Sequence, residues 1–395
     1  MESKNIVSRA KELQPHLAQI RRDLHRHPEV GFDLHYTLEA IKKELDDIGV
    51  SYSLCGKAGI IVDFGTSGKR ILLRSDMDAL PVSEEADIEY KSENEGKMHG
   101  CGHDMHMAML LGAARILKEN ENRIKGRIRL IFQPAEEIFK GSLDMMENGS
   151  LNEVDAAMML HVLTGYPIPS GKMLTLTGGV RMSGCEQYHI TVYGKGGHGS
   201  NPHMAIDPIT AAAHIHIAFN EINARELDPN GFGVFTTGKF SAGSVSNVIP
   251  DKAEMWGTIR TNDPTGKTGE MIKTRMTEIA DGVAKAFRCK AEAEFFDAVP
   301  CMVVDDKLSE STYKYMNELF GDDVMRVDDS GGGSEDFAFV SHKVPTVSMM
   351  ISVGCSNDGY VYGLHNPKAI FDDSLLWKGA ASYAQMGLRW DEENN

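Results

Sequence analysis

The pattern of apolar and polar positions predicts helices at the start of the chain, followed by buried strands. Residues 5–27 carry apolar side chains at helical spacing up to His27-Pro28, and a second helix is predicted over about 36–48. Apolar runs follow at 60–64 and 71–74, and the second is typical of an interior strand covered on both faces. Further strands are predicted at 127–132, 156–160 and 346–351, and a last helix from about residue 374. This order indicates an α/β domain.

The stretch from about residue 183 to 296 has a different order of elements. Its patterns predict strand 188–193, helix 207–225, strands 233–240 and 253–260, helix 266–287 and strand 290–296. Asp207-Pro208 begins the first helix as an N-cap followed by proline at the first helical position. The order βαββαβ is that of a ferredoxin-like fold, which forms as a unit. We therefore expect residues 184–296 to be an inserted domain, and residues 1–183 and 297–395 to form the domain that it interrupts.

Charge and composition exclude several classes of function. The formal net charge of -16 at pH 7 argues against nucleic acid or an anionic membrane as the main partner. No apolar run approaches the roughly 18 residues of a membrane-spanning helix. The polar N-terminal stretch lacks the apolar core of a signal peptide, and the six cysteines are scattered, unlike a disulfide framework. These features predict a cytoplasmic protein with reduced thiols.

The stretch Met98–His106 packs a thiol, three imidazoles and a carboxylate into nine residues. Its glycines leave the backbone free to turn, so Cys101 and His103 could point at one centre. A helical pattern follows at once, with Asp104 placed to cap it, and a thiol just before a helix N-terminus is favoured as the metal-binding thiolate. The alternative is a tight turn with a buried cysteine and surface histidines. Two ligands do not complete a metal site, so distant partners are needed.

Further polar side chains follow predicted strands. They are Asp76 and Asp78 after 71–74, Glu136 and Glu137 after 127–132, His161 after 156–160, and His365 in the later Gly363–Pro367 stretch. Open α/β sheets place their chemistry at the carboxyl ends of strands. Taken singly, these residues are equally compatible with a turn rich in Asp and Pro, a surface pair of glutamates and hydrogen-bonded core histidines.

Together, the candidates form a coherent ligand set. It consists of one thiolate, three imidazoles and one carboxylate, from Cys101, His103, Glu137, His161 and His365. Five side chains exceed the four of a closed tetrahedral site, so two metal ions that share a bridge make better chemical sense. Zinc suits the thiolate and imidazoles best, and manganese, cobalt and nickel are the alternatives.

A glycine-rich stretch at 330–337 is a separate candidate, because such loops can cradle a phosphate. It lacks the lysine and the spacing of a P-loop, and it does not follow a predicted strand. We therefore predict a shaped loop that lines a pocket.

Several sequence blocks resemble those of one enzyme family. RSDMDALP, MHGCGHDMH, FQPAEE, LHV, GKGGHGSNPH, SNVIPD, GTIRT, GGGSEDFAF and GLHNP look like successive blocks of the M20 metallopeptidases. They are most similar to the amidohydrolase branch, which contains aminoacylases, hippurate hydrolases and plant auxin-conjugate hydrolases. The resemblance covers nearly the whole chain. It implies an α/β/α catalytic domain with a mostly parallel sheet, interrupted by a lid domain that commonly mediates dimerisation.

The resemblance also implies roles for single residues. The five candidates Cys101, His103, Glu137, His161 and His365 match the metal ligands. Glu136 matches the general base, and Asp78 matches the carboxylate that steadies the site. One departure is Asp76, which stands where other M20 peptidases have a first histidine ligand, so the second metal position depends on Cys101 and His103. Asp76, His99, Asp104 and His106 are expected to be structural or to support the ligands.

Three residues of the inserted domain match substrate-binding positions. His198 resembles the histidine that polarises the scissile carbonyl, often across a dimer. Asn247 and Arg260 resemble residues that position the substrate and its free carboxylate. The chemistry of Arg260 fits independently, because a guanidinium binds a carboxylate with two hydrogen bonds and an acidic protein needs such a local anchor. The alternative for an arginine at a strand end is a surface ion pair.

The sequence therefore predicts a metal-dependent enzyme that hydrolyses the amide bond of N-acyl amino acids, with a metal-activated water and Glu136 as base. The nearest alternatives on the same scaffold are a dipeptidase or carboxypeptidase and an N-acetyl-diaminopimelate deacetylase. A non-catalytic binding module would not need Glu136, and a thiol nucleophile at Cys101 is the last alternative. We expect a small-molecule substrate, no nucleic acid or membrane partner, and a homodimer formed through the inserted domain.

Overall fold

The computed structural model describes residues 3–328 and 332–395. Contacts between residues divide the described chain into two units. The first takes the described residues of Met1–Arg181, Val303–Asp329 and Glu335–Asn395, and the second takes those of Met182–Met302 and Ser330–Ser334. The second unit therefore extends past the expected boundary at 296, because the last strand of its sheet runs on to Val299.

An eight-stranded sheet forms the centre of the first unit. Its strand order is β1 (Tyr52–Cys55), β2 (Gly59–Phe64), β4 (Arg127–Gln133), β3 (Arg70–Asp76), β5 (Ala156–Leu163), β16 (Thr346–Ser352), β6 (Met173–Leu176) and β15 (Val324–Val327). The four interior strands β4, β3, β5 and β16 run parallel to one another. Antiparallel pairs join β1 to β2, β2 to β4 and β6 to β16. Every residue of β3 is buried, as the apolar pattern of 71–74 predicted.

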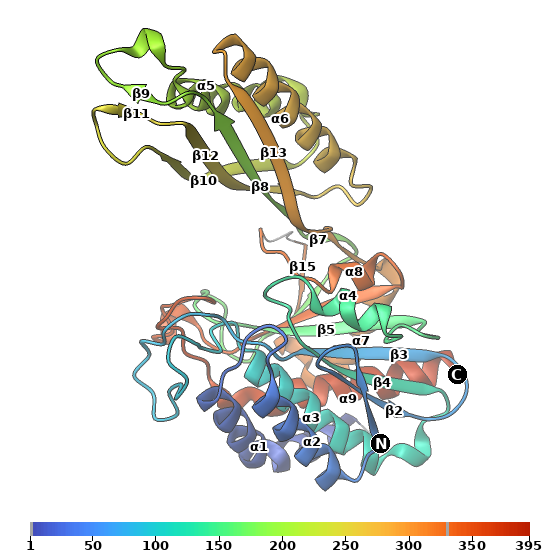
Figure 1. Cartoon of the computed structure of the whole chain (residues 1–395). Helices are drawn as coiled ribbons and strands as arrows, with labels where there is room; N and C mark the ends of the chain where they lie inside the picture. The colour runs from blue at the N-terminus through green and yellow to red at the C-terminus, as the bar shows by residue number, and fades with distance from the viewer. Residues whose placement is uncertain (1–2, 329–331) are drawn as a thin grey trace. The chain divides into compact units, whose positions relative to one another are not determined.

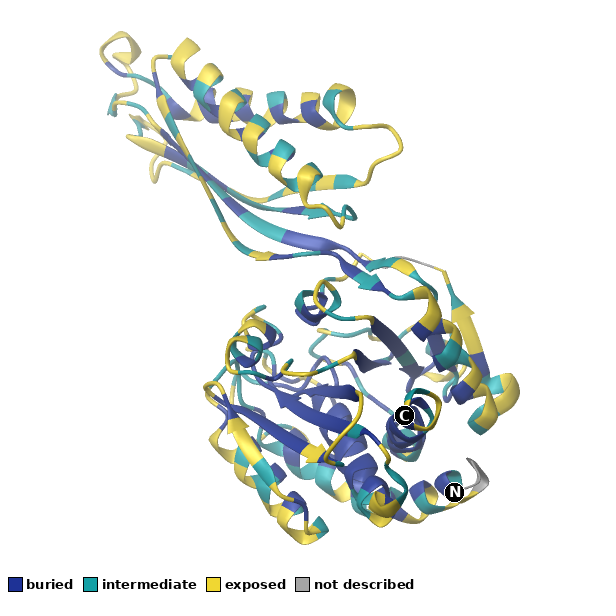
Figure 2. Ribbon diagram, turned by 90° about the vertical axis from the view of Figure 1, so that its right-hand side faces the viewer, coloured by how far each residue is buried: buried dark blue, intermediate teal, exposed yellow. Residues whose placement is uncertain are grey.

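Helices cover both faces of this sheet. Figure 1 shows α1 (Ser3–Arg26), α2 (His35–Ile48), α3 (His103–Glu119) and α9 (Leu376–Asn394) on one face, and the short helices α4 (Gly141–Glu147) and α8 (Ala338–Ser341) on the other. α3 packs against both α1 and α9 and is almost wholly buried, whereas the outer faces of the surrounding helices are exposed (Figure 2). The predicted α/β/α fold with a mostly parallel sheet is confirmed.

The chain between β13 and β16 is more structured than its sequence pattern indicated. Three elements precede β16 here: β14 (Met302–Val304), α7 (Asp306–Phe320) and β15. β14 pairs with β7 (Gly179–Met182). The expectation that the sheet resumes directly at Thr346 was therefore incomplete. The glycine-rich stretch at 330–337 does follow a strand, β15, contrary to our prediction; residues 330 and 331 of that stretch lie outside the described residues.

The second unit has the predicted ferredoxin-like order. Its four-stranded antiparallel sheet is ordered β10 (Gly233–Ala242), β12 (Lys252–Thr261), β8 (Gly184–Tyr193) and β13 (Lys290–Val299). α5 (Pro208–Glu221), which continues as a π-helical turn Ile222–Glu226, and α6 (Lys267–Ala286) pack against this sheet. Asp207 caps α5 as expected, because its side chain accepts a hydrogen bond from the main-chain N–H of Ile209. Two further strands of two residues each, β9 (Gly197–His198) and β11 (Val248–Ile249), pair antiparallel with each other in the same unit.

Within the described residues, no helix is both long and apolar enough to cross a lipid bilayer. The cytoplasmic location stays a prediction.

Candidate metal centre

The candidate side chains of the first unit gather where the parallel strands end. Asp76 is the last residue of β3, and Asp78 follows it. Glu136 and Glu137 follow β4, and His161 lies near the end of β5. Cys101 precedes α3, His103 begins it, and His365 lies in the loop after β16. Carboxyl ends of neighbouring parallel strands meet at one sheet edge, which is where open α/β sheets bind their ligands.

The start of α3 differs from the sequence prediction. Gly102, not Asp104, is the N-cap residue, and it adopts a left-handed conformation with φ of 85°. Asp104 lies in the first turn, where its carboxylate contacts Arg21 Nε at 2.8 Å and His25 Nδ1 at 2.8 Å. Asp104 therefore ties the segment that carries the ligands to α1 instead of capping its own helix.

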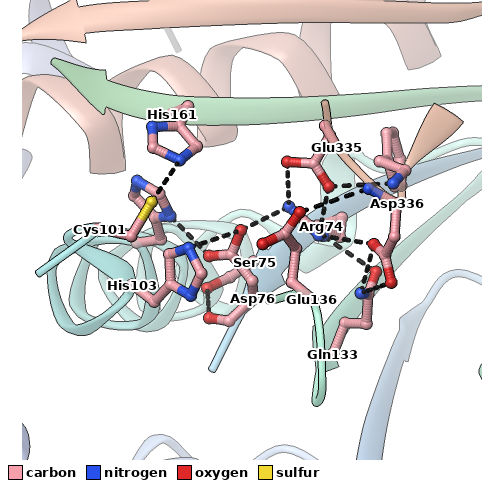
Figure 3. A network of polar contacts seen from close by, with 12 residues as sticks. Arg74, Ser75, Asp76, Cys101, His103, Gln133, Glu136, His161, Glu335 and Asp336 are labelled. Carbon is pink, nitrogen blue, oxygen red and sulfur yellow. Dashed lines mark hydrogen bonds and ion pairs between the residues drawn. The ribbon is translucent and has the colours of Figure 1, made fainter. Parts of the chain in front are cut away.

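Cys101 lies at the centre of the five candidate ligands. Its Sγ is 3.5 Å from His161 Nε2 and 3.2 Å from His365 Nε2. Glu137 Oε1 is 3.6 Å from His365 Nε2 and 3.9 Å from His103 Nε2. The ligand atoms of Cys101, His103 and His161 all lie within 4.8 Å of one another, and so do those of Cys101, Glu137 and His365. The structure thus brings together all five side chains, and the two groups share the thiol. Figure 3 shows Cys101, His103 and His161 among them.

Main-chain groups orient the imidazoles. His103 Nδ1 lies 2.8 Å from the carbonyl oxygen of Asp78, and His161 Nδ1 lies 2.7 Å from that of Val162. A carbonyl oxygen only accepts, so each Nδ1 carries the proton and each Nε2 keeps a lone pair directed at the centre. His106 differs: its Nε2 accepts from the N–H of Val162 and its Nδ1 donates to Asp76. Both of its nitrogens are occupied, as expected of a supporting residue.

Two buried atoms at the centre lack a hydrogen-bond partner in the described structure. They are Nε2 of His103 and Oε1 of Glu137. A buried acceptor without a donor is costly, and such atoms in a native protein call for an explanation. A cation bound between the two atoms would explain them, because both atoms can donate a lone pair to a metal ion. The residues present therefore fit a divalent metal ion.

Burial controls the charges of these groups. It raises the pKa of the Cys101 thiol well above its usual range, and the neighbouring Glu137 adds to this shift. It raises the pKa of Glu137 to about 8 and lowers the pKa of His161 to about 3. The prediction that the helix N-terminus favours the Cys101 thiolate was therefore wrong for the metal-free protein, since burial and carboxylates outweigh it. A bound cation reverses this balance.

Asp78 and Asp336 hold the two adjacent glutamates. The carboxylate of Asp78 accepts hydrogen bonds from the main-chain N–H of Glu136 at 2.9 Å and of Glu137 at 3.2 Å. The main-chain N–H of Asp336 donates to Oε1 of Glu136 at 3.3 Å. Glu137 Oε1 lies near the imidazoles of His103 and His365. Glu136 is bonded to the main-chain N–H of Asp336, and one of its oxygens also lies within 4.8 Å of ligand atoms of His103 and Glu137.

The second unit places two of its three candidate residues together. His198 in β9 is exposed, and its Nδ1 accepts from Ser200 Oγ at 2.7 Å. The carbonyl of Asn247 accepts from the N–H of Gly199 at 2.8 Å. Both residues lie at the end of the sheet where β12 begins, since β11 leads into β12 at Lys252.

Arg260 lies apart from them. It occurs eight positions after Lys252 on β12, which corresponds to about 27 Å of strand. Its Nη1 donates to Ser334 Oγ at 2.8 Å and to the carbonyl of Gly332 at 3.2 Å. Within this unit, Arg260 therefore lies toward the end of β12 that is far from the β9–β11 pair, which carries His198.

Sequence reasoning missed a buried ionic group beside the centre. Arg74 on β3 contacts Asp76, Glu335 and Asp336 (Figure 3). The available signal was the arginine in the otherwise apolar run Ile-Leu-Leu-Arg, because a buried charge must be paired.

The chain is similar to known proteins in sequence and in fold. Residues 72–389 match the profile of peptidase family M20/M25/M40. Thermostable carboxypeptidase 2 of Saccharolobus solfataricus is 34% identical over 97% of both chains. Hippurate hydrolase of Campylobacter jejuni is 33% identical over 98% of this chain and 99% of its own. The solved structure of a dinuclear metal-binding peptidase of family M20 from Bacillus subtilis superposes with a TM-score of 0.81 at 29% identity, over 97% of this chain and 99% of that chain.

The close approach of α3 to β5 is testable at Gly102. A Cβ there would lie 2.3 Å from Val162 Cγ2, whereas a Cβ at Gly96, which also has positive φ, meets nothing within 4 Å. We expect Gly96→Ala to lower the free energy of unfolding by about 1–2 kcal/mol, and Gly102→Ala by about 1–3 kcal/mol more, because of the overlap. Urea unfolding of the metal-free protein measures both values; equal losses would contradict the packing described.

Metal uptake should release protons. At pH 7 the metal-free protein holds protons on the Cys101 thiol and on most of Glu137, since both pKa values are raised, whereas His161 is already neutral. Binding of a divalent ion to the deprotonated ligands must therefore expel protons. We expect fewer released protons as the pH rises through about 8, where Glu137 ionises on its own. Calorimetric titration in two buffers of different ionisation enthalpy counts them, and zero release at pH 7 would refute the ligand assignment.

Proposed function

The chain belongs to peptidase family M20/M25/M40, and we propose that it is a metal-dependent hydrolase of the amide bond in N-acyl amino acids. The observation that carries this proposal is the pair Glu136 and Glu137, held side by side by Asp78. Glu137 faces the thiol and imidazoles as a ligand, and Glu136 is left as a base. A binding module without turnover has no use for that second carboxylate. The relative named hippurate hydrolase supports the substrate class.

Two divalent ions are the proposed cofactors, held by Cys101, His103, Glu137, His161 and His365. When bound, they supply a Lewis acid that acidifies water and polarises the amide carbonyl. The dinuclear relative from B. subtilis supports the number of ions. Zinc suits the thiol and imidazoles best, with manganese, cobalt and nickel as alternatives.

We propose that Asp76 does not replace the histidine ligand that other M20 peptidases have at its position. Its Oδ1 accepts from His106 at 2.6 Å, and its Oδ2 accepts from Arg74 at 2.6 Å. Both oxygens are therefore engaged. This supports the view that Cys101, shared by the two ligand groups, takes over the missing ligand's part.

Glu136 moves the proton in the proposed reaction. It takes one proton from the attacking water while the water oxygen bonds to the acyl carbon. It then passes that proton to the amide nitrogen as the C–N bond breaks. The products are a carboxylic acid and a free amino acid, so atoms and charge balance. Asp78 contributes by fixing the backbone turn on which Glu136 lies.

The second unit is proposed to bind the substrate. Arg260 would anchor the free carboxylate, and His198 and Asn247 would position the scissile carbonyl. Since about 27 Å of β12 separates Arg260 from Lys252, the end near the β9–β11 pair that carries His198, a small substrate does not reach both from a single copy. We therefore propose that a second copy of the chain supplies His198.

A homodimer through the second unit fits its exposed surface. The edge strand β10 has β12 on one side only among the described strands. Val234 and Phe240 on β10, and Ile217 on α5, are exposed apolar side chains. Long exposed edges with apolar residues favour pairing with another chain. The mass in solution tests this: we expect twice the 43.5 kDa of one chain, and a monomer at assay concentration would rule it out.

A carboxypeptidase is the second candidate function. The relative named thermostable carboxypeptidase 2 favours it, and the same residues serve both reactions, since a C-terminal peptide bond is also the amide of an amino acid. The two differ only in what is attached to the acyl carbon.

The substitutions Glu136→Gln and Glu137→Gln should have different effects on metal content. We expect Glu136→Gln to keep its metal ions and to lose at least about 100-fold in kcat, because acid–base catalysis contributes that much. Glu137→Gln should lose metal as well, because it removes a ligand. Elemental analysis and steady-state kinetics on both variants measure these effects. Loss of metal from Glu136→Gln, with retention in Glu137→Gln, would reverse the two assignments.

A substrate panel tests the proposed reaction directly. N-benzoyl-glycine, N-acetyl amino acids and dipeptides are compared under one metal condition, together with an N-acyl amine that lacks the carboxylate. We expect N-acyl amino acids to give the highest kcat/KM, and Arg260→Ala to lower it by about 10–100-fold, as for loss of a charged hydrogen-bonded pair. The amine should be poor with wild type and unaffected by the substitution. Preference for dipeptides would favour the carboxypeptidase, and no turnover of either class would refute the proposed function.

A further inference from the structure

Arg74 is a buried guanidinium on β3, directly after the apolar residues 71–73. It is 1% exposed and lies two residues before Asp76 on β3. The ring of Phe337 covers it at 5.4 Å. A charge in such a place must be paired and hydrogen-bonded, or the fold excludes it. Its partners therefore indicate what it is for.

All five N–H groups of Arg74 find an acceptor. Nε donates to Gln133 Oε1 at 3.0 Å, and Nη1 donates to Asp76 at 2.6 Å and to Glu335 at 3.3 Å. Nη2 donates to Glu335 at 2.8 Å and to Asp336 at 3.1 Å. The contact with Glu335 uses both of its oxygens, which sets the orientation as well as the distance. Figure 3 shows the guanidinium between Asp76 and the segment that carries Glu335 and Asp336.

Asp336 connects this arginine to Glu136. Its carboxylate accepts from Gln133 Nε2 at 2.7 Å and from the main-chain N–H of Ser142 at 2.9 Å. These bonds fix the backbone at Asp336, whose own N–H donates to Oε1 of Glu136 at 3.3 Å. One oxygen of Glu136 is thereby held toward Asp336.

We propose that Arg74 is a positioning residue that, through Glu335 and Asp336, fixes the carboxylate of Glu136 so that it stays free of the metal ions. The inference rests on the proposed function, in which Glu136 is the base and Glu137 the ligand. It also gives the end of the 330–337 stretch a role other than the pocket lining that the sequence indicated. Arg74 moves no proton itself; it keeps the group that does so in place.

Arg129 offers a matched control in the same sheet. It is also buried, it lies on β4, and it pairs with both oxygens of Asp63 at 2.8 and 2.7 Å. It also donates to the carbonyls of Gly149 and Ser150. Among the described contacts, none of these partners touches Glu136. Removing Arg129 therefore reports the cost of losing a buried, paired arginine without disturbing the base.

The experiment compares Arg74→Ala, Arg74→Lys and Arg129→Ala with wild type in the metal-loaded protein. It measures metal content, thermal unfolding, and kcat and KM for N-benzoyl-glycine, with and without millimolar guanidinium. For Arg74→Ala we expect full metal content, little change in KM and a fall in kcat of about 100-fold, the cost of a misplacement of about 1 Å at a reacting group. Added guanidinium should restore part of kcat, and Arg74→Lys should retain part of it. Arg129→Ala should unfold at a lower temperature but keep its kcat and show no response to guanidinium.

Three results would overturn the proposal. They are an unchanged kcat in folded, metal-loaded Arg74→Ala, a loss of kcat that only follows a loss of metal, and a guanidinium response as large in Arg129→Ala. If Arg74→Ala does not fold, Glu335→Gln takes its place, because it keeps the size of the side chain. It should lower kcat about tenfold with metal retained, by the same loss of positioning. An unchanged kcat in Glu335→Gln would also overturn the proposal. Wild type that turns over no N-acyl amino acid refutes the proposed function instead, so the two failures are distinguishable.

Discussion

The crowding of ionisable side chains in a buried place is the constraint on which this structure depends. At the carboxyl edge of the sheet, one thiol, four imidazoles and five acidic side chains form groups whose ligand atoms lie within 4.8 Å of one another, and most of these side chains are buried. Burial alone drives each toward its neutral form: the pKa of Glu137 rises to about 8 and that of His161 falls to about 3. Only a positive charge at the same place makes the ionised ligands stable, which is why a cation site explains the arrangement.

Two sources of positive charge divide this cluster. On one side, the lone pairs of Cys101, His103 and His161 converge, and within the described structure Nε2 of His103 and Oε1 of the nearby Glu137 have no hydrogen-bond partner. On the other side, Arg74 supplies five donors to Gln133 and three carboxylates. Glu136 and Glu137 lie between them, tied by Asp78. Adjacent, chemically identical side chains thus face different surroundings, and this difference allows one to be a ligand and the other a base.

The sequence predicted those parts that depend on local patterns. The run at 71–74, apolar except for Arg74, is a buried interior strand. Asp207-Pro208 begins a helix, because the preference of Asp for the N-cap and that of Pro for the first helical position are both local. What the sequence could not show depends on distant contacts. Asp104 pairs with Arg21 and His25 instead of capping α3. α7 is amphipathic with few apolar residues, and Arg74 meets Glu335 across more than 250 positions. Periodicity carries no information about such partners.

The most direct test of the account is anomalous X-ray scattering from crystals of the protein loaded with zinc or manganese. The account predicts two peaks within bonding distance of the ligand set, both near Cys101 Sγ, with Glu136 outside the coordination sphere of either ion. A loaded crystal without scattering at Cys101, or with Glu136 as a ligand and Glu137 free, would contradict it.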